Sequence, residues 1–253
     1  MKYGRRPARH TLKTMRSAIV MHRHLTALGH APAVGNDYVS AVTVPWGMYL
    51  NDSIGDCVCA DTAHALMLRT ANSSGIVIPT DADVLALYET VGGYNPTDPS
   101  TDQGCDETAM CQYLESTGFL GHKSNATGMI DPSNIDHIKW AAHLFGSVRL
   151  GFNMPVSAMA QFDNGRPWDI DPAADNSLDG GHDVPLVAYD SDFFHVITWG
   201  RIQAVTPAFF AKYCDEAHAE VFLDWIRATG VAPSGFNANQ LVADLAGLVS
   251  GAP

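Results

Sequence analysis

The sequence has no run of 18 apolar residues that could cross a bilayer, and it contains only five cysteines in 253 residues. Its opening stretch, MKYGRRPARHTLKTMRSAIV, lacks the uninterrupted apolar core of a secretory signal. The cysteine spacings do not match the paired ligands of a zinc site, and the odd count leaves at least one thiol unpaired. We therefore expect a soluble protein in a reducing compartment, either cytoplasmic or virion-associated, without a metal ion or cofactor. The 46% hydrophobic content is enough for a substantial core.

Acidic residues are absent before Asp37, whereas residues 1–36 carry seven of the 15 lysines and arginines. The rest of the chain carries all 27 acidic residues and only eight basic ones. Such a body repels phosphates, so we do not expect nucleic-acid binding. The basic arm is instead predicted to contact the acidic body of its own chain, another protein, or a second copy through residues 1–36.

The sequence has no internal repeat of 20 to 50 residues. Changes in composition and hydrophobic periodicity divide it into four parts. Residues 1–45 lack a clear period and form a predicted basic arm, and residues 46–130 form a helical part. Residues 131–225 carry apolar runs typical of an antiparallel sheet, and residues 226–253 form a C-terminal helical extension. The predicted helices lie at 57–71, 81–90, 107–117, 135–145 and 239–248.

Local signals refine these elements. Asp81 or Asp83 is a candidate cap for one helix, and Asp106 is a candidate for the next. The runs DVPLVAY and FFHVITW are separated by DSD, which predicts a hairpin. The polar stretch 169–180 is expected at the surface; it is rich in oxygen ligands but departs from the EF-hand calcium pattern.

Two cysteines lie at the predicted start of the first helix of this part, in NDSIGDCVCADTAH. A thiolate is stabilised at a helix N-terminus by unpaired amides and the helix dipole. Cys57 occupies that end behind Gly55 and Asp56, which makes it a candidate nucleophile, although a buried structural thiol is the alternative. Cys59 points about 200° away around the helix and is predicted to pack in the core. Packing is also the prediction for Cys105, Cys111 and Cys214, with a Cys59–Cys105 bridge conceivable.

A cysteine nucleophile needs a base nearby. His182, in LDGGHDVPLVAYD, follows two glycines that leave its approach open and precedes an apolar strand that would hold its ring. The alternative is a hydrogen-bonded histidine at a strand end. His64 lies two helical turns from Cys57, and we expect it to be structural.

Taken in order, NDSIGDC, GSVRLGFNMPVSAMAQF, GGHDVPLVAYD and HVITWG resemble the papain-like cysteine peptidases over residues 46–200, about 60% of the chain. DQGCDETAMCQYLESTGF is similar to that family's Gly-Cys segment and following helix. The resemblance implies an α+β fold, with a helical left lobe, an antiparallel β-barrel-like right lobe and a cleft between them. It also implies a peptidase or amidase of bacterial or phage type, acting on peptides or proteins.

The resemblance implies roles for individual residues. Cys57 and His182 would form the catalytic dyad, and Asn51, at the position of the family's oxyanion-hole Gln, would donate its amide; turn chemistry is the alternative for Asn51. Trp199 would shield the histidine or simply fill the core. We expect Gly55, Asp56, Gly181 and Trp199 to line the substrate site.

The sequence departs from the family at the residue that orients the histidine, where the family has Asn. Counting forward from His182 places Thr198 there, and anchoring on Trp199 places Ile197 there. Only Thr198 could hold the imidazole, through its hydroxyl. A second hypothesis follows: a papain-like fold kept as a weakened or inactive binding or structural module, in a phage particle or another assembly.

Overall fold

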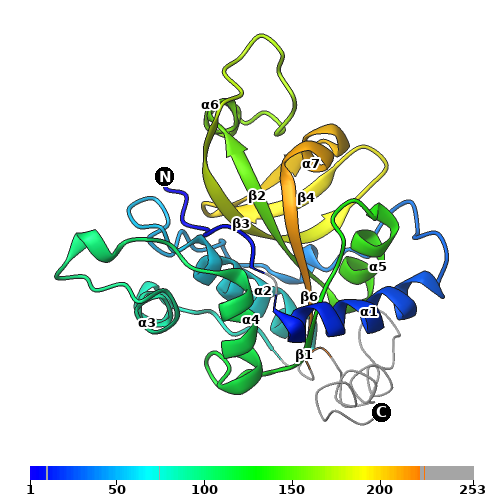
Figure 1. The fold of residues 1–253 in the computed structure, drawn as a ribbon, viewed down its shortest axis with the longest axis horizontal. Coiled ribbons are helices and arrows are strands. Elements are labelled where there is room, and N and C mark those ends of the chain that lie inside the picture. The colour runs from blue at the N-terminus through cyan, green and yellow to red at the C-terminus, as the bar shows by residue number, and fades with distance from the viewer. Residues whose placement is uncertain (10, 74, 223–224, 226–253) are drawn as a thin grey trace.

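A computed structural model describes the chain except for residues 10, 74, 223–224 and 226–253. Helices form one half of the molecule and an antiparallel sheet the other, as the α+β prediction required (Figure 1). The α-helices are α1 Leu12–Thr26, α2 Cys57–Ser73, α3 Asp81–Gly92, α4 Glu107–Ser116, α5 Ile135–Phe145, α6 Val156–Asp163 and α7 Pro207–Tyr213. Two 3-10 turns are η1 Val39–Ala41 and η2 Pro99–Thr101. The strands are β1 Ser124–Met129, β2 Val148–Pro155, β3 Leu178–Tyr189, β4 Phe194–Thr198, β5 Arg201–Val205 and β6 Cys214–Phe222.

The helix predictions hold in α2 to α5, with one change in capping. Asp106 caps α4 by accepting from the amide of Ala109, as predicted. At α3, however, the N-cap is Thr80, which forms a reciprocal capping box with Asp83, so neither Asp81 nor Asp83 is the cap itself. The carboxylate of Asp83 instead receives the Thr80 amide at 2.8 Å.

The strands pair antiparallel in the order β1-β6-β2-β3-β4-β5. The DSD stretch closes the predicted β3–β4 hairpin. In the next hairpin, Trp199 and Gly200 occupy the turn between β4 and β5 with φ of 44° and 75°. This left-handed backbone suits tight hairpins and readily accepts glycine. It leaves the Trp199 indole buried in the core of the sheet.

Two boundaries differ from the predicted parts. Residues 1–45, in which the sequence showed no clear period and predicted an arm, contain α1, whose Met21 is fully buried against Gly128 of β1. The arm therefore lies on the body of its own chain. In addition, β1 falls within the predicted helical part but pairs with β6. The predicted helix 239–248 lies outside the described residues.

The core is formed by apolar clusters on either side of the α2–β3 contact. One cluster lies between the sheet and the helices α1, α5, α6 and α7, and another surrounds α2, α3 and α4. The polar stretch 169–180 is mostly exposed, as expected. No helix in the described part of the chain combines the length and apolarity needed to cross a membrane.

Candidate active site

Cys57 is the first residue of α2, and its side chain is 1% exposed. The carbonyl of Asp56 accepts the amides of Cys59 and Ala60, so the helix starts where the sequence predicted. The Cys57 sulfur therefore lies at the end of the helix whose dipole favours negative charge. Cys59 is fully buried in the cluster around α2, in agreement with its predicted packing role.

His182 lies on β3, where its ring is buried and fixed on two sides. Its Nε2 is 2.7 Å from the hydroxyl of Thr198 at the end of β4. The indole of Trp199 stacks on the ring, with centroids 4.5 Å apart and planes inclined by 17°. Of the two positions that the sequence offered for holding the imidazole, the structure places Thr198 against it and Ile197 in another apolar cluster. Nδ1 has no hydrogen-bond partner among the described residues, the Cys57 sulfur included.

The two candidate residues, 125 positions apart in the sequence, lie on elements that pack together. Helix α2 contacts β3, and the Cys57 sulfur lies within hydrogen-bonding reach of the backbone amide of Asp183, the residue after His182. The sulfur is thus beside the strand that carries the imidazole.

A buried arginine fastens α2 to this strand. Arg149 of β2 has a side chain with no exposed surface, and its guanidinium forms an ion pair with the Asp183 carboxylate. Its further contacts are Asp61 at 3.4 Å, Glu220 at 3.2 Å, the Val58 carbonyl at 3.1 Å and the Thr62 hydroxyl at 2.9 Å. The network joins the first turns of α2 to β2, β3 and β6. An arginine inside the apolar run SVRLGFN was the sequence signal, and the sequence reasoning did not use it.

Burial holds both candidate catalytic groups in their neutral forms. It raises the pKa of the Cys57 thiol well above its ordinary value, and the negative charge of Asp183 adds to this effect. Burial also lowers the pKa of His182 to about 3. The site as described therefore contains a thiol and a neutral imidazole, because water is excluded from both.

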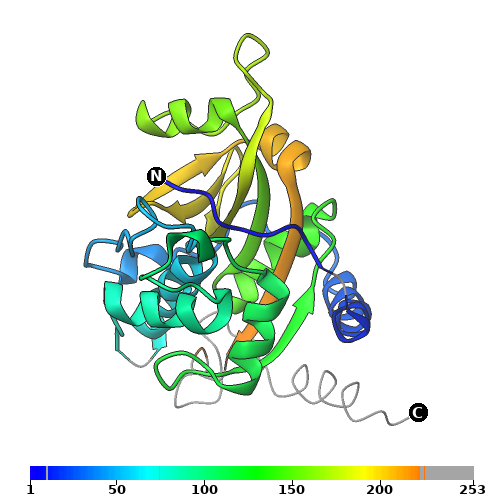
Figure 2. The same cartoon turned by 60° about the vertical axis from the view of Figure 1, so that its left-hand side comes forward.

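Residues 2–6 exclude that water by passing between the helices and the sheet. Figure 2 shows this dark-blue segment crossing from the terminus marked N, between the helices and the strands. The Gly4 amide donates to the Gly181 carbonyl at 3.1 Å, and the Gly4 carbonyl accepts from the Cys105 amide at 2.7 Å. The ring of Tyr3 lies 5.4 Å from that of His182. The Gly4 backbone also lies near the Cys57 sulfur, where it slightly offsets the rise in the pKa of that thiol.

Most of the predicted substrate-lining residues touch this segment. A Cβ atom at Gly4 would lie 1.9 Å from the Gly55 carbonyl oxygen, so the close approach requires glycine. Gly181 accepts the segment's amides, and Trp199 lies 5.8 Å from the Tyr3 ring. Asp56 differs from these three because it is fully buried beneath the helix start, where burial raises its pKa to about 8.

Asn51 lies beside the same segment and is 2% exposed. Its backbone carbonyl accepts from the Lys2 amide at 2.9 Å, and its side-chain nitrogen donates to the Ile54 carbonyl at 3.3 Å. The Asn51 side chain also hydrogen-bonds to the Asp56 carboxyl, which partly offsets the rise that burial causes in the pKa of Asp56.

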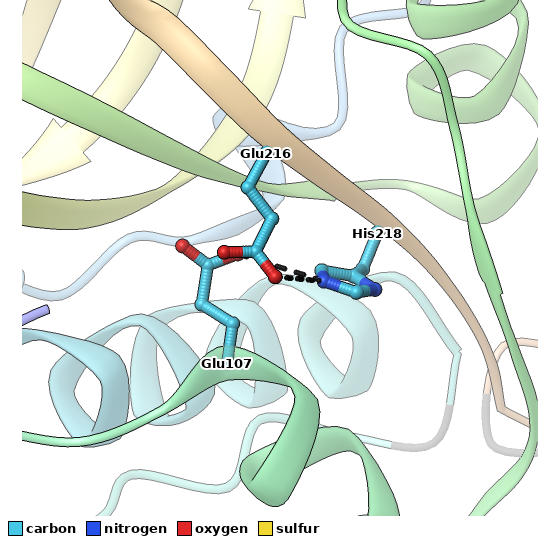
Figure 3. A group of neighbouring side chains, drawn as sticks. All are labelled: Glu107, Glu216 and His218. Atoms are coloured by element: carbon cyan, nitrogen blue, oxygen red, sulfur yellow. Dashed lines mark hydrogen bonds and ion pairs between the residues drawn. The ribbon is translucent and has the colours of Figure 1, made fainter. Parts of the chain in front are cut away.

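Three buried side chains next to the segment could hold a cation. Glu107 of α4 points toward Glu216 and His218 of β6 (Figure 3), and one potential ligand atom from each lies within 4.8 Å of the others. A cation from the chain itself already pairs with the carboxylates: Arg5 Nε is 2.6 Å from Glu107, and Arg5 Nη2 is 2.9 Å from Glu216. The sequence reasoning assigned Arg5 only to a basic arm and did not identify these acidic partners.

The remaining candidates behave as packing residues. All five cysteines are free, and Cys105 and Cys111 are buried. Cys59 and Cys105 are close enough to hydrogen-bond without forming the bridge that was considered. Cys214 is only half-buried. The Nε2–H of His64 donates to the Gly47 carbonyl at 2.8 Å, in keeping with the structural role expected of this residue.

No protein-family model and no curated protein sequence matches the chain. Solved structures do match it. Xylellain, a cysteine protease from Xylella fastidiosa, superposes with a TM-score of 0.62 at 16% identity, over 87% of this chain and 95% of that one. Procathepsin B S9 from Trypanosoma congolense gives 0.57 at 12% identity, over 85% and 82%. The Carica candamarcensis cysteine protease CMS1MS2, in complex with E-64, gives 0.53 at 14% identity, over 75% and 98%. The chain has the fold of the papain-like cysteine proteases.

Proposed function

We propose that the protein is a cysteine peptidase or amidase in which Cys57 is the nucleophile and His182 the general base and acid. The observation that carries this proposal is the state of His182. Its Nε2 is fixed by Thr198, and its face is covered by Trp199. Its buried Nδ1 lacks a hydrogen-bond partner, and the backbone of Asp183, the next residue of β3, lies near the Cys57 sulfur. The structural His64 also has an unpaired Nδ1, so the Thr198 contact, the Trp199 cover and the contact of β3 with α2 are what distinguish His182.

The chemistry follows from these positions. Nδ1 of His182 takes the proton of Cys57, and the sulfur attacks the substrate carbonyl carbon. When the C–N bond breaks, the imidazolium returns that proton to the leaving amine, which leaves a thioester on Cys57. Water, deprotonated by His182, then attacks the thioester, and the acid product and free thiol are released. An amine in place of water would give acyl transfer by the same dyad.

The developing oxyanion needs donors that are already in place. We assign this role to the side-chain amide of Asn51, which would turn from Asp56 toward the substrate, and to the backbone amide of Cys57 at the start of α2. The substrate backbone would use the groups that now bind residues 2–6, namely the Gly181 carbonyl and the Cys105 amide. Catalysis therefore requires residues 2–6 to leave this position.

The direct test uses the chain with Gly4→Val, which displaces residues 2–6 by a clash with Gly55, and labels it with an irreversible, thiol-directed peptide inhibitor before the adduct is mapped. We expect the adduct on Cys57, and we expect His182→Ala to reduce the labelling rate strongly. Cys59→Ser serves as the matched control because that thiol lies two residues away in the core. Labelling that avoids Cys57, or that proceeds unchanged in His182→Ala, would contradict the proposal.

A second function is favoured by one observation, the neutral and covered state of Cys57 and His182. A papain-like module that only binds or assembles would keep this state permanently. In that case residues 2–6 would stay in place under all conditions, and neither peptide turnover nor inhibitor labelling would appear after their displacement by mutation.

A further inference from the structure

The Arg5 side chain occupies a buried acidic pocket directly beside the proposed dyad. Its guanidinium has no exposed surface and pairs with Glu107 at 2.6 Å, with Asp215 at 2.7 Å and with Glu216 at 2.9 Å. The side chains of Glu107 and Glu216 are themselves 0% and 1% exposed. The neighbouring residue of the segment, Gly4, is the one that meets the Cys57 sulfur.

The pocket is defined by its shape as well as by its charge. Gly151 of β2 forms part of that wall, and a Cβ atom there would lie 2.2 Å from Arg5 Nε and 2.3 Å from Glu107 Oε1. Any other residue at 151 would fill the space of the guanidinium. A flat, forked cation facing several carboxylates is the geometry in which arginine is preferred to lysine.

One wall of the pocket is held in position independently of Arg5. Glu216 Oε1 is 2.8 Å from Nε2 of His218, whereas its other oxygen faces Arg5 (Figure 3). His218 thus fixes the carboxylate before a ligand arrives, which lowers the cost of binding. The charge of Arg5 and this hydrogen bond hold the pKa of Glu216 below its usual value despite burial.

The backbone contacts of the segment do not depend on its sequence. The Arg5 and Gly4 amides both donate to the Gly181 carbonyl, and the Arg6 amide donates to the Cys105 carbonyl at 2.9 Å. Any extended peptide can form such bonds, so the side-chain pocket decides which peptide is favoured. Tyr3 contributes less, since its buried hydroxyl has no partner among the described residues.

We infer that this pocket, formed by Glu107, Glu216, Asp215 and Gly151, is a specificity site for an arginine side chain of the peptide ligand. Arg5 fills it in cis and so anchors residues 2–6 over the dyad. The inference rests on the proposed function for its meaning, but the binding of arginine peptides is measurable without any turnover.

The test uses the full chain with Arg5→Ala, which empties the pocket. Cys57 alkylation by iodoacetamide is followed by mass spectrometry, with the peptide acetyl-Lys-Tyr-Gly-Arg-Arg-amide as competitor. In the matched peptide, citrulline replaces the first of the two arginines, which keeps the shape and removes the charge. We expect Arg5→Ala to speed alkylation at least tenfold. We also expect the arginine peptide to protect Cys57 at a concentration at least ten times lower than the citrulline peptide does.

Three further variants complete the design. Arg6→Ala is the control, because within the described part of the chain the Arg6 guanidinium donates to the carbonyls of Gly92 and Gln103 and to no carboxylate, so alkylation should change less than threefold. Gly4→Val displaces the segment by steric clash with Gly55 and leaves the pocket intact, so it replaces Arg5→Ala if that variant does not fold. Adding Glu216→Gln should remove the preference for arginine over citrulline. Equal protection by both peptides, or protection by neither, would overturn the inference, whereas peptide preference without turnover would contradict only the proposed function.

Discussion

The His182 ring is held against the Thr198 hydroxyl, with 2.7 Å between Nε2 and Oγ1. Thr198 therefore stands where the papain-like resemblance placed an amide side chain. We expect Thr198→Val to lower peptidase kcat roughly 10- to 100-fold with a small change in KM, because the ring loses the group that orients it. Thr198→Asn should recover much of the rate. Steady-state kinetics in the Arg5→Ala background measures this; an unchanged kcat in Thr198→Val would contradict the orienting role.

Asn51 is predicted to act on the transition state. Asn51→Ala should lower kcat by roughly 10- to 1000-fold and leave KM within about threefold, because an oxyanion donor binds the transition state rather than the substrate. Asn51→Asp, which has nearly the same shape, should be at least as slow. A rise in KM at constant kcat would instead indicate that Asn51 only positions residues 50–56.

Arg149 is predicted to stabilise the folded protein by holding α2 against β2, β3 and β6, the packing on which the site depends. Arg149→Met removes the cation shared by Asp61, Asp183 and Glu220, and leaving buried carboxylates uncompensated costs about 3–5 kcal/mol of unfolding free energy. Arg149→Lys keeps the charge and should recover part of this loss. Urea unfolding measures both variants, and a loss below about 1 kcal/mol in Arg149→Met would contradict the assigned role.

His64 should make the protein less stable in acid. Burial lowers its pKa from 6.5 to about 4, so the unfolded chain binds a proton that the folded chain rejects between these values. The stability from neutral His64 is complete above about pH 6.5 and is lost as the pH falls toward 4, by about 3 kcal/mol in all. Compared with wild type, His64→Gln should lose less stability over this interval in urea unfolding. Parallel pH curves for the two proteins would contradict this.

The sequence could predict the elements that local chemistry determines. Helix α2 begins at Cys57, and α5 spans the predicted 135–145, because apolar side chains recur at helical intervals in both and Asn134 caps α5. Helix α1 was missed, since the prolines and basic residues around it obscured its period and its stability depends on contacts such as Met21 with β1.

Sequence reasoning could propose candidate site residues where a local motif marks the position. Cys57, His182 and Trp199 were proposed from motifs, and Thr198 from counting forward from His182. The sequence could not show the contact of Arg5 with Glu107 and Glu216. These residues lie on three segments up to 211 positions apart and meet only in the folded chain. The Arg149 network was hidden for the same reason, although a charged residue within an apolar strand is a signal that can be used elsewhere.

The pairing of Cys57 with His182 is tested most directly by the pH dependence of Cys57 alkylation in the full chain carrying Arg5→Ala, with and without His182→Ala. If the imidazole stabilises the thiolate, the half-maximal rate will fall at least two pH units lower when His182 is present than when it is absent. Coincident profiles, both rising near the ordinary thiol pKa of about 8.5, would show that the two residues do not act as a pair.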